Sequence, residues 1–179
     1  MRPVVQDFVH RALMNEDIAG KTVLEVGSYN VNGSVRPYIE SLEPAKYVGL
    51  DMREGPGVDL TWDCERQDEL GLDWDLVVST EMLEHAHDWR ACMTQMATAV
   101  TPGGLLLVTT VSPGFPYHGY PSDFWRFPLE DLGCITETLG LDNFMLEDGR
   151  EWMVAVLARK PLDWDKPGSL DDITVPGVT

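Results

Sequence analysis

The chain has 179 residues, of which 44% are hydrophobic and 24% charged, and this length suits one buried core better than two. Thirteen lysines and arginines stand against thirty aspartates and glutamates, so the net charge is −17, with no basic stretch. Nucleic-acid binding depends on cations that neutralise phosphates, and anionic membrane surfaces repel a negative protein. We therefore expect a small molecule as the partner, with no nucleic acid and no membrane.

The expected location is cytoplasmic. The three cysteines are far apart and form no CxxC pair, which is typical of a reduced protein rather than of a disulfide framework or a zinc site. Charges interrupt residues 1–21 at short intervals, unlike a signal peptide. No apolar run approaches the roughly 18 residues that a membrane-spanning helix needs.

Apolar spacing predicts alternating strands and helices along most of the chain. The helices are expected at residues 3–15, 32–42, 89–100 and 128–139. The strands are expected at residues 22–26, 47–50, 76–79 and 105–111, with a further short strand possible at 58–62. Pro37 is compatible with its helix only near the first turn, and Asp88 is placed to cap the third helix.

The end of the chain departs from this alternation. Two apolar runs, 144–146 and 152–158, flank Asp148-Gly149, a pattern typical of a β-hairpin. The alternation itself predicts an α/β protein with a mostly parallel sheet and helices on both faces, so the hairpin would add one antiparallel strand at the far end. We expect residues 1–160 to form a single domain and residues 161–179 to form a loose, extended, acidic tail.

Gly27, Ser28, Tyr29 and Gly33 follow the first expected strand. A turn of this kind brings backbone close to a ligand at the carboxyl end of an α/β sheet. Tyr29 stands where the dinucleotide motif GxGxxG needs its second glycine, and Glu25 places a carboxylate where a pyrophosphate would lie. A cationic ligand group tolerates that carboxylate, although an ordinary strand-to-helix turn could contain the same residues.

Asp51 ends the next expected strand. Its carboxylate can accept hydrogen bonds from both hydroxyls of a ribose, and Met52 can lie against a flat aromatic base. Asp63 and Cys64 follow the possible strand 58–62 and could reach the edge of that base. The alternatives are a strand cap for Asp51 and a solvated loop residue for Asp63.

A third polar segment, STEMLEH, begins at Ser79, where the strand 76–79 ends. Taken in order, EVGSYNVNG, VGLDMREGPGVD, WDLVVSTEMLEH and TPGGLLLVTTV resemble motifs I, II, IV and V of class I S-adenosylmethionine-dependent methyltransferases. The resemblance covers residues 20–160 approximately, and STEMLEH is particularly similar to the ubiquinone-biosynthesis type of O-methyltransferase. It implies a Rossmann-like fold whose seven-stranded sheet ends in an antiparallel hairpin, and S-adenosyl-L-methionine as the cofactor.

The resemblance also implies a role for each matched residue. The cofactor loop would comprise Glu25, Gly27, Ser28, Tyr29 and Gly33, with Asp51 on the ribose, Met52, Asp63 and Cys64 at the adenine, and Thr80 and Glu81 beside the methionine part. The family's second loop glycine is replaced by Tyr29, whose ring would either narrow the pocket or turn outwards and cover it.

Glu81, Glu84 and His85 form an ExxEH spacing. If a helix begins here, all three side chains share one face. Some methyltransferases with this spacing bind a divalent cation, so Mg²⁺ or Mn²⁺ is a possible ligand, with His118 as a further donor. The alternative, which we favour, is a metal-free helix start with solvated carboxylates and a packed histidine.

The loop 112–127 is rich in proline, glycine and aromatics, and loops of this length in compact proteins usually cover or bind something. It is either an aromatic seal over the sheet end or the acceptor pocket, whose candidate residues are Tyr117, Tyr120, Asp123, Trp125 and Arg126. An oxygen acceptor must lose a proton, for which His85 and His118 are the candidate catalytic bases.

The function predicted is methyl transfer to a small-molecule acceptor, at oxygen in preference to nitrogen or carbon. The alternatives are an accessory protein that binds an adenosyl compound without catalysis and, less favoured by the glycine spacing and the hairpin, a nicotinamide-dependent oxidoreductase. The short chain contains no inserted substrate domain, so a homodimer that completes the pocket is possible.

Overall fold

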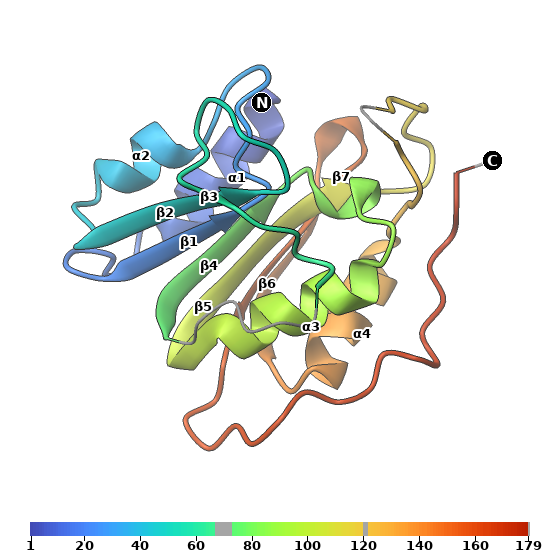
Figure 1. Ribbon diagram of the computed structural model, residues 1–179. Helices are drawn as coiled ribbons and strands as arrows, with labels where there is room; N and C mark the ends of the chain where they lie inside the picture. The colour runs from blue at the N-terminus through green and yellow to red at the C-terminus, as the bar shows by residue number, and fades with distance from the viewer. Residues whose placement is uncertain (67–72, 120–121, 179) are drawn as a thin grey trace.

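A seven-stranded sheet in the order β3-β2-β1-β4-β5-β7-β6 forms the centre of the computed structural model, which describes residues 1–66, 73–119 and 122–178 (Figure 1). The strands are β1 (Thr22–Val26), β2 (Lys46–Asp51), β3 (Leu60–Thr61), β4 (Trp74–Thr80), β5 (Val100–Val111), β6 (Asp142–Asp148) and β7 (Met153–Arg159). Strands β1 to β5 pair in parallel, whereas β7 is antiparallel to both β5 and β6. The predicted parallel sheet with a closing hairpin is confirmed.

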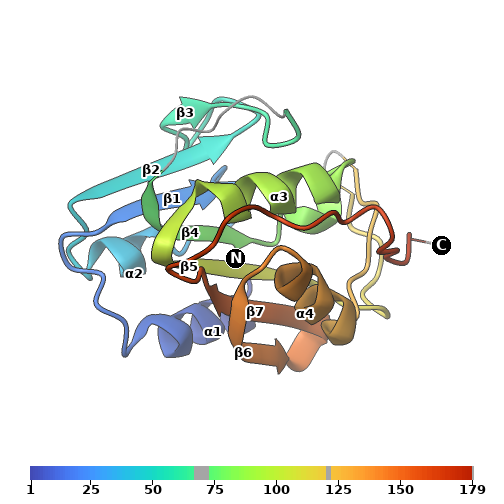
Figure 2. The same cartoon turned by 90° about the horizontal axis from the view of Figure 1, so that it is seen from below.

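Helices cover both faces of the sheet, as expected. They are α1 (Pro3–Leu13), α2 (Arg36–Glu40), α3 (Trp89–Ala99) and α4 (Leu129–Thr138), with short 3₁₀ turns η1 (Leu83–His85) and η2 (Arg150–Trp152). Figures 1 and 2 show α3 and α4 on one face and α1 on the opposite face.

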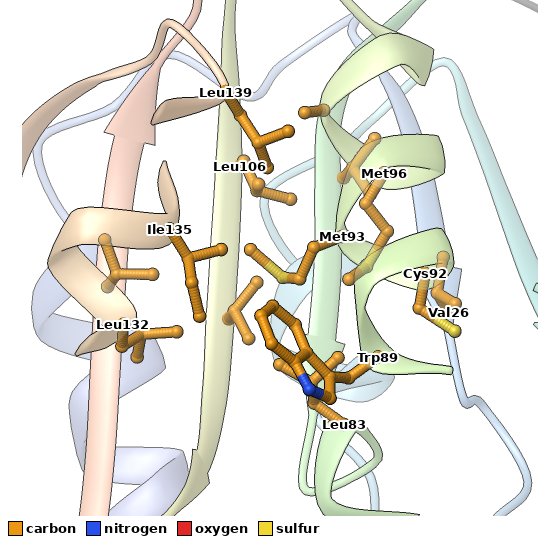
Figure 3. Close-up of a cluster of buried hydrophobic side chains, with 14 of the residues drawn as sticks. Val26, Leu83, Trp89, Cys92, Met93, Met96, Leu106, Leu132, Ile135 and Leu139 are labelled. Carbon is orange, nitrogen blue, oxygen red and sulfur yellow. The ribbon is translucent and has the colours of Figure 1, made fainter. Parts of the chain in front are cut away.

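Two hydrophobic cores result from the alternation of side chains along the strands. Leu24 and Val26 of β1 point to α3 and α4, where Trp89, Met93 and Ile135 are fully buried (Figure 3). The intervening strand residues join the core beneath α1 and α2. Because both faces of the central strands are buried, the strands are rigid supports for the loops at their carboxyl ends.

The helix predicted over 32–42 is shorter than expected, because α2 begins only at Arg36. Before it, the Asn30 side chain accepts a hydrogen bond from the backbone N–H of Gly33 at 2.8 Å, and Gly33 itself has φ +125°. These local contacts keep residues 32–35 in a loop. The third helix matches the prediction, since Asp88 accepts a hydrogen bond from the backbone N–H of Ala91 at 3.1 Å.

The tail after Pro161 is extended but packed, which differs from the loose segment expected. It runs between α3 and α4 (Figure 2) and buries Leu170 and Val175 in the core beneath those helices. The Arg90 guanidinium of α3 donates to the backbone carbonyls of Leu170 and Ile173. Two buried apolar residues and these hydrogen bonds fix a segment whose acidic composition alone predicts disorder. Among the described residues, no helix is long and apolar enough to span a bilayer.

Candidate active site

A cavity of about 480 Å³ opens at the carboxyl ends of β1, β2 and β4, a volume typical of small-molecule sites. All eleven residues expected at the cofactor line it, namely Glu25, Gly27, Ser28, Tyr29, Gly33, Asp51, Met52, Asp63, Cys64, Thr80 and Glu81. Both candidate bases, His85 and His118, line it as well. The sequence positions marked separately along the chain therefore meet around one cavity.

Gly27 forms the floor of this cavity after β1. Its φ is +81°, and a Cβ placed there would lie 2.5 Å from Met82 Cγ, so both the backbone conformation and the space require glycine. The N–H groups of Gly27 and Ser28 both donate to the Leu50 carbonyl, at 2.8 and 3.0 Å. The turn is held by neighbouring β2, which leaves its outer face open to the cavity.

Tyr29, in place of the usual glycine, leans over the loop between β2 and β3. A Cβ on Gly55 would lie 2.1 Å from the Tyr29 ring, so glycine at that position makes room for the tyrosine. The Arg53 guanidinium lies over the same ring at 4.9 Å, within the range of a cation–π contact. The ring therefore covers one side of the cavity.

Asp51 lies at the end of β2 with its carboxylate tied to the backbone. Its Oδ2 accepts a hydrogen bond from the Tyr29 N–H at 3.3 Å, and its Oδ1 accepts one from the Arg53 N–H at 3.0 Å. Met52 beside it is 61% exposed, and Cys64, which also lines the cavity, is buried. A carboxylate that is held but still accessible, beside a free thioether, can bind a diol and a flat ring.

Glu25 is buried, and the Tyr47 hydroxyl donates to its Oε2 at 2.8 Å. Burial raises the pKa of Glu25 to about 7, although the hydrogen bond from Tyr47 opposes the shift. The same burial and the neighbouring carboxylate raise the pKa of Tyr47. Glu25 thus keeps a proton more readily than an exposed glutamate does, and a cation in the cavity would favour its ionised form.

Glu81 does not share a helical face with Glu84 and His85, which corrects the expectation from the ExxEH spacing. Glu81 has φ +54° and the helical turn η1 starts only at Leu83. Arg2 donates from Nε to Glu81 Oε2 at 2.8 Å, and Thr109 also donates to this carboxylate. Burial is the main cause that raises the pKa of Glu81 to about 7, and the negative charge of nearby Glu84 adds to it.

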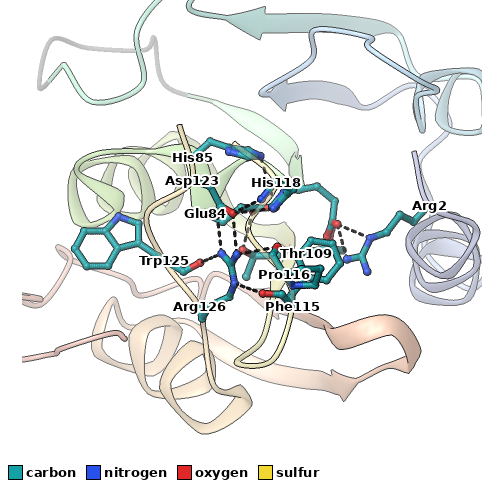
Figure 4. A network of polar contacts seen from close by, with 12 residues as sticks. Arg2, Glu84, His85, Thr109, Phe115, Pro116, His118, Asp123, Trp125 and Arg126 are labelled. Carbon is teal, nitrogen blue, oxygen red and sulfur yellow. Dashed lines mark hydrogen bonds and ion pairs between the residues drawn. The ribbon is translucent and has the colours of Figure 1, made fainter. Parts of the chain in front are cut away.

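Glu84, His85 and His118 form the cluster that the structure brings together instead (Figure 4). Glu84 is fully buried, its Oε2 accepts a hydrogen bond from Thr110 at 2.8 Å, and its Oε1 lies 3.6 Å from His118 Nε2. His85 Nδ1 contacts the Ser122 carbonyl. One potential ligand atom from each of these three residues lies within 4.8 Å of the others.

His118 lies between two carboxylates. Its Nδ1 is 2.9 Å from Asp123 Oδ2, on the side of the ring opposite Glu84. The hydrogen bond to Glu84 raises the pKa of His118, and the charge of Asp123 adds to this. Burial alone would raise the pKa of Asp123, but hydrogen bonds from Arg126 and from the His118 backbone lower it to about 2.

The residues expected to bind the acceptor are placed differently from expectation. Asp123 and Arg126 are buried and bonded to each other, and the Trp125 Nε1–H donates to the Ala86 carbonyl at 2.8 Å. Tyr117 is 66% exposed and does not line the cavity. Tyr120 lies outside the described residues. The loop seals the sheet end with these side chains and presents His118 to the cavity.

Several lining residues were not expected from the sequence, among them Arg2, Trp62 and Phe115. Arg2 lies over the Phe115 ring at 4.9 Å and meets Glu81, 79 residues away along the chain. Ser28 Oγ and Trp62 Nε1, which also line the cavity, are buried without a hydrogen-bond partner among the described residues. Such buried polar atoms usually have a partner, so a polar ligand would satisfy them.

These features define a class of protein, the class I methyltransferase fold, and comparisons with known proteins agree. The family described as "Methyltransferase domain" matches residues 1–150. The chain belongs to this family of S-adenosylmethionine-dependent methyltransferases.

The individual relatives are more distant. The chain is 28% identical over 142 residues to phthiotriol/phenolphthiotriol dimycocerosates methyltransferase 1 of Mycobacterium ulcerans, covering 70% of this chain and 51% of that protein. It is 28% identical over 127 residues to the ubiquinone biosynthesis O-methyltransferase of Chromobacterium violaceum, covering 63% and 52%. The chain thus spans about half the length of these curated relatives.

A solved structure shares the fold. The N-methyltransferase NodS of Bradyrhizobium japonicum, in complex with S-adenosyl-L-homocysteine, superposes with a TM-score of 0.64 at 16% identity. The match covers 87% of this chain and 84% of NodS. At this low sequence identity, the match shows a shared fold and nothing further.

Proposed function

We propose that the protein binds S-adenosyl-L-methionine in this cavity and transfers its methyl group to an oxygen of a small-molecule acceptor. The observation that carries the proposal is the convergence of all eleven expected cofactor residues on one cavity in a chain of this family. When bound, this cofactor supplies an electrophilic methyl group on a sulfonium. The protein has to align the acceptor with that group and exclude water.

The cavity suits a long ligand whose two ends differ in chemistry. Asp51 ends β2 and Glu81 follows β4, and β1 lies between these two strands. The ends of β2 and β4 are therefore about 10 Å apart at the usual strand spacing. At the β2 end, Asp51 would accept the ribose hydroxyls and Met52 would cover the adenine, with Asp63 and Cys64 at its edge.

At the β4 end, Arg2 and Glu81 offer a cation and an anion side by side. This pair complements a zwitterionic amino-acid group, whose carboxylate would meet Arg2 and whose ammonium would meet Glu81. The carboxylate of Glu25 favours a positive charge nearby. No pyrophosphate is complementary to the anions that line this cavity.

The acceptor would lie beside His118 and Phe115, which line the cavity from the loop 112–127. A neutral hydroxyl is a weak nucleophile, so His118 would remove its proton as the oxygen–methyl bond forms. The proton passes to Nε2 while Nδ1 keeps its proton towards Asp123. Because the ring must be neutral to act, turnover should rise with pH through the raised pKa of His118.

Oxygen is favoured as the acceptor atom by this base and by the relative named as an O-methyltransferase. A small molecule is favoured because the net charge of −17 opposes phosphate backbones. We further infer a cytoplasmic enzyme, a single domain to which the packed tail after residue 160 contributes, and a homodimer as a way to close the open side of the cavity.

Calorimetry with S-adenosylmethionine, S-adenosylhomocysteine and NAD tests the cofactor. We expect both adenosyl compounds to bind and NAD to show no measurable heat. Binding of NAD alone would contradict the proposal.

A screen with methyl-labelled cofactor against phenols, catechols, amines and carboxylic acids tests the acceptor. Replacing His118 with alanine should lower turnover about 10²–10⁴-fold with little change in cofactor affinity. His85→Ala is the matched variant, because His85 also lines the cavity and the comparison shows which imidazole removes the proton. Cofactor binding without transfer to any acceptor would favour the accessory-protein alternative.

A further inference from the structure

Arg126 closes the loop 112–127 from within. Its guanidinium is buried and donates to the carbonyls of Phe115, Pro116 and Trp125 at 3.0, 3.1 and 2.7 Å. The same group donates to both carboxylate oxygens of Asp123, at 2.6 and 2.7 Å. A single side chain therefore joins the two ends of the loop, and a planar fork with five donors is suited to this.

Asp123 connects Arg126 to His118. Its Oδ2 accepts a hydrogen bond from the His118 backbone N–H at 2.9 Å and lies 2.9 Å from the Nδ1 of the same residue. A neutral ring carries one proton, and Asp123 Oδ2 lies closer to Nδ1, at 2.9 Å, than Glu84 Oε1 lies to Nε2, at 3.6 Å, which favours the proton on Nδ1. Nε2 then carries the lone pair of a ring that lines the cavity.

A second support comes from the end of the chain. The Arg126 backbone N–H donates to the Pro176 carbonyl at 2.8 Å, and the Val178 N–H donates to the Phe124 carbonyl at 2.8 Å. Trp125 and Gly177 form an antiparallel bridge between these bonds. Residues 175–178 thus pair with residues 124–126, while Leu170, buried in the core, anchors the tail upstream.

We propose that Asp123, Arg126 and residues 175–178 form a positioning assembly that fixes His118 with its proton on Nδ1. Asp123 selects the tautomer, Arg126 fixes Asp123, and the tail segment holds the backbone of Arg126. The importance of this for catalysis rests on the proposed function, but the ring geometry does not. Among the described residues, four groups from η1 and the loop 112–127 face the ring: Glu84, His85, Phe115 and Asp123.

The ¹⁵N spectrum of the histidine side chains in the full chain tests the assembly, recorded above the raised pKa of His118 so that this ring is neutral. In the unaltered protein, His118 should carry its proton on Nδ1. In Asp123→Asn, the neutral amide offers a single oxygen to Arg126, to the His118 backbone N–H and to Nδ1, so the acceptor at Nδ1 is weakened. The proton should therefore move to Nε2, which faces the Glu84 carboxylate. A similar change in a hydrolytic triad lowers turnover about 10⁴-fold.

Asp142→Asn, at an exposed position of β6, is the matched control and should leave the His118 spectrum unchanged. The proposal is wrong if His118 carries its proton on Nε2 in the unaltered protein, or keeps it on Nδ1 in Asp123→Asn. Asp123→Asn leaves the buried guanidinium without its carboxylate, so a second variant is needed in case this one does not fold.

That second variant ends at Val175 and removes the residues that carry both backbone hydrogen bonds, leaving the Asp123–Arg126 pair and the buried Leu170 and Val175 intact. Amide exchange of residues 122–127 should accelerate at least about tenfold, because two backbone hydrogen bonds are lost, and His118 should show both tautomers. Unchanged exchange and an unchanged tautomer would overturn the role of the tail. S-adenosylhomocysteine binding, measured on the same samples, tests the cofactor proposal separately.

Discussion

The strand ends that line the cavity and the loop 112–127 place their polar side chains differently. At the ends of β1, β2 and β4, every residue expected at the cofactor lines the cavity. In the loop, of the marked residues that the structure describes, His118 lines it, whereas Asp123 and Arg126 turn inwards to each other. Sheet topology fixes where a strand-end residue lies, but in a long loop the partners of each side chain decide.

The largest expected effect separates two aspartates, one from each region. Asp123→Ala leaves the Arg126 guanidinium buried without its carboxylate, so we expect a loss of about 3–5 kcal/mol in the free energy of unfolding. Asp51→Ala should cost below about 1 kcal/mol without ligand, since water can reach the backbone groups that it binds. Urea unfolding of both variants measures the difference.

Asp123→Leu combined with Arg126→Met sharpens this comparison. Replacing both charges with apolar groups removes the uncompensated cation, so the double variant should be more stable than Asp123→Ala. If Asp123→Ala unfolds at the same urea concentration as the unaltered protein, the ion pair does not hold the loop.

The second prediction concerns the pH dependence of stability, for which Glu25 and Asp123, one from each region, have opposite signs. The pKa of Glu25 is raised to about 7 by burial, so the folded state binds the extra proton and is stabilised as pH falls. Between pH 7 and 5 this should add on the order of 2 kcal/mol. The pKa of Asp123 is lowered to about 2, so its contribution is present above its unfolded pKa and is lost as pH falls towards 2.

Glu25→Gln is the control for this pH dependence. It should flatten the rise in melting temperature between pH 7 and 5, with the remaining slope due to Glu81 and His118, whose pKa values are also raised. A profile identical to that of the unaltered protein would show that Glu25 does not titrate in this range.

These contrasts show what the sequence could predict and what it could not. Thr22–Val26 is read correctly because a short apolar run before glycine has a single outcome in a parallel sheet. The placement of Glu81 is not predicted correctly, because its left-handed backbone and its pairing with Arg2 depend on contacts far along the chain. The tail is misjudged for the same reason, since the hydrogen bonds from Arg90 have no local signal in the sequence.

The third prediction concerns cofactor affinity at the strand ends. Asp51→Ala should weaken S-adenosylhomocysteine binding by about 1–2 kcal/mol, roughly tenfold, through lost charge-assisted hydrogen bonds to the ribose. Calorimetry measures this, and Asp142→Asn again serves as the control. An unchanged dissociation constant would place the ribose elsewhere in the cavity.

The smallest expected effect is that of divalent metal ions. Glu81 is held by Arg2, so Glu84 is the single carboxylate in the cluster with His85 and His118. Mg²⁺ prefers several oxygen ligands, and an imidazolium at His118 accounts for the two carboxylates beside it. We therefore expect EDTA, Mg²⁺ and Mn²⁺ to leave turnover and the melting temperature unchanged. The opposite outcome would be a melting temperature that Mn²⁺ raises by several degrees in the unaltered protein but not in His118→Ala. It would show that the cluster binds a metal, and the role of His118 would then be that of a ligand rather than a base.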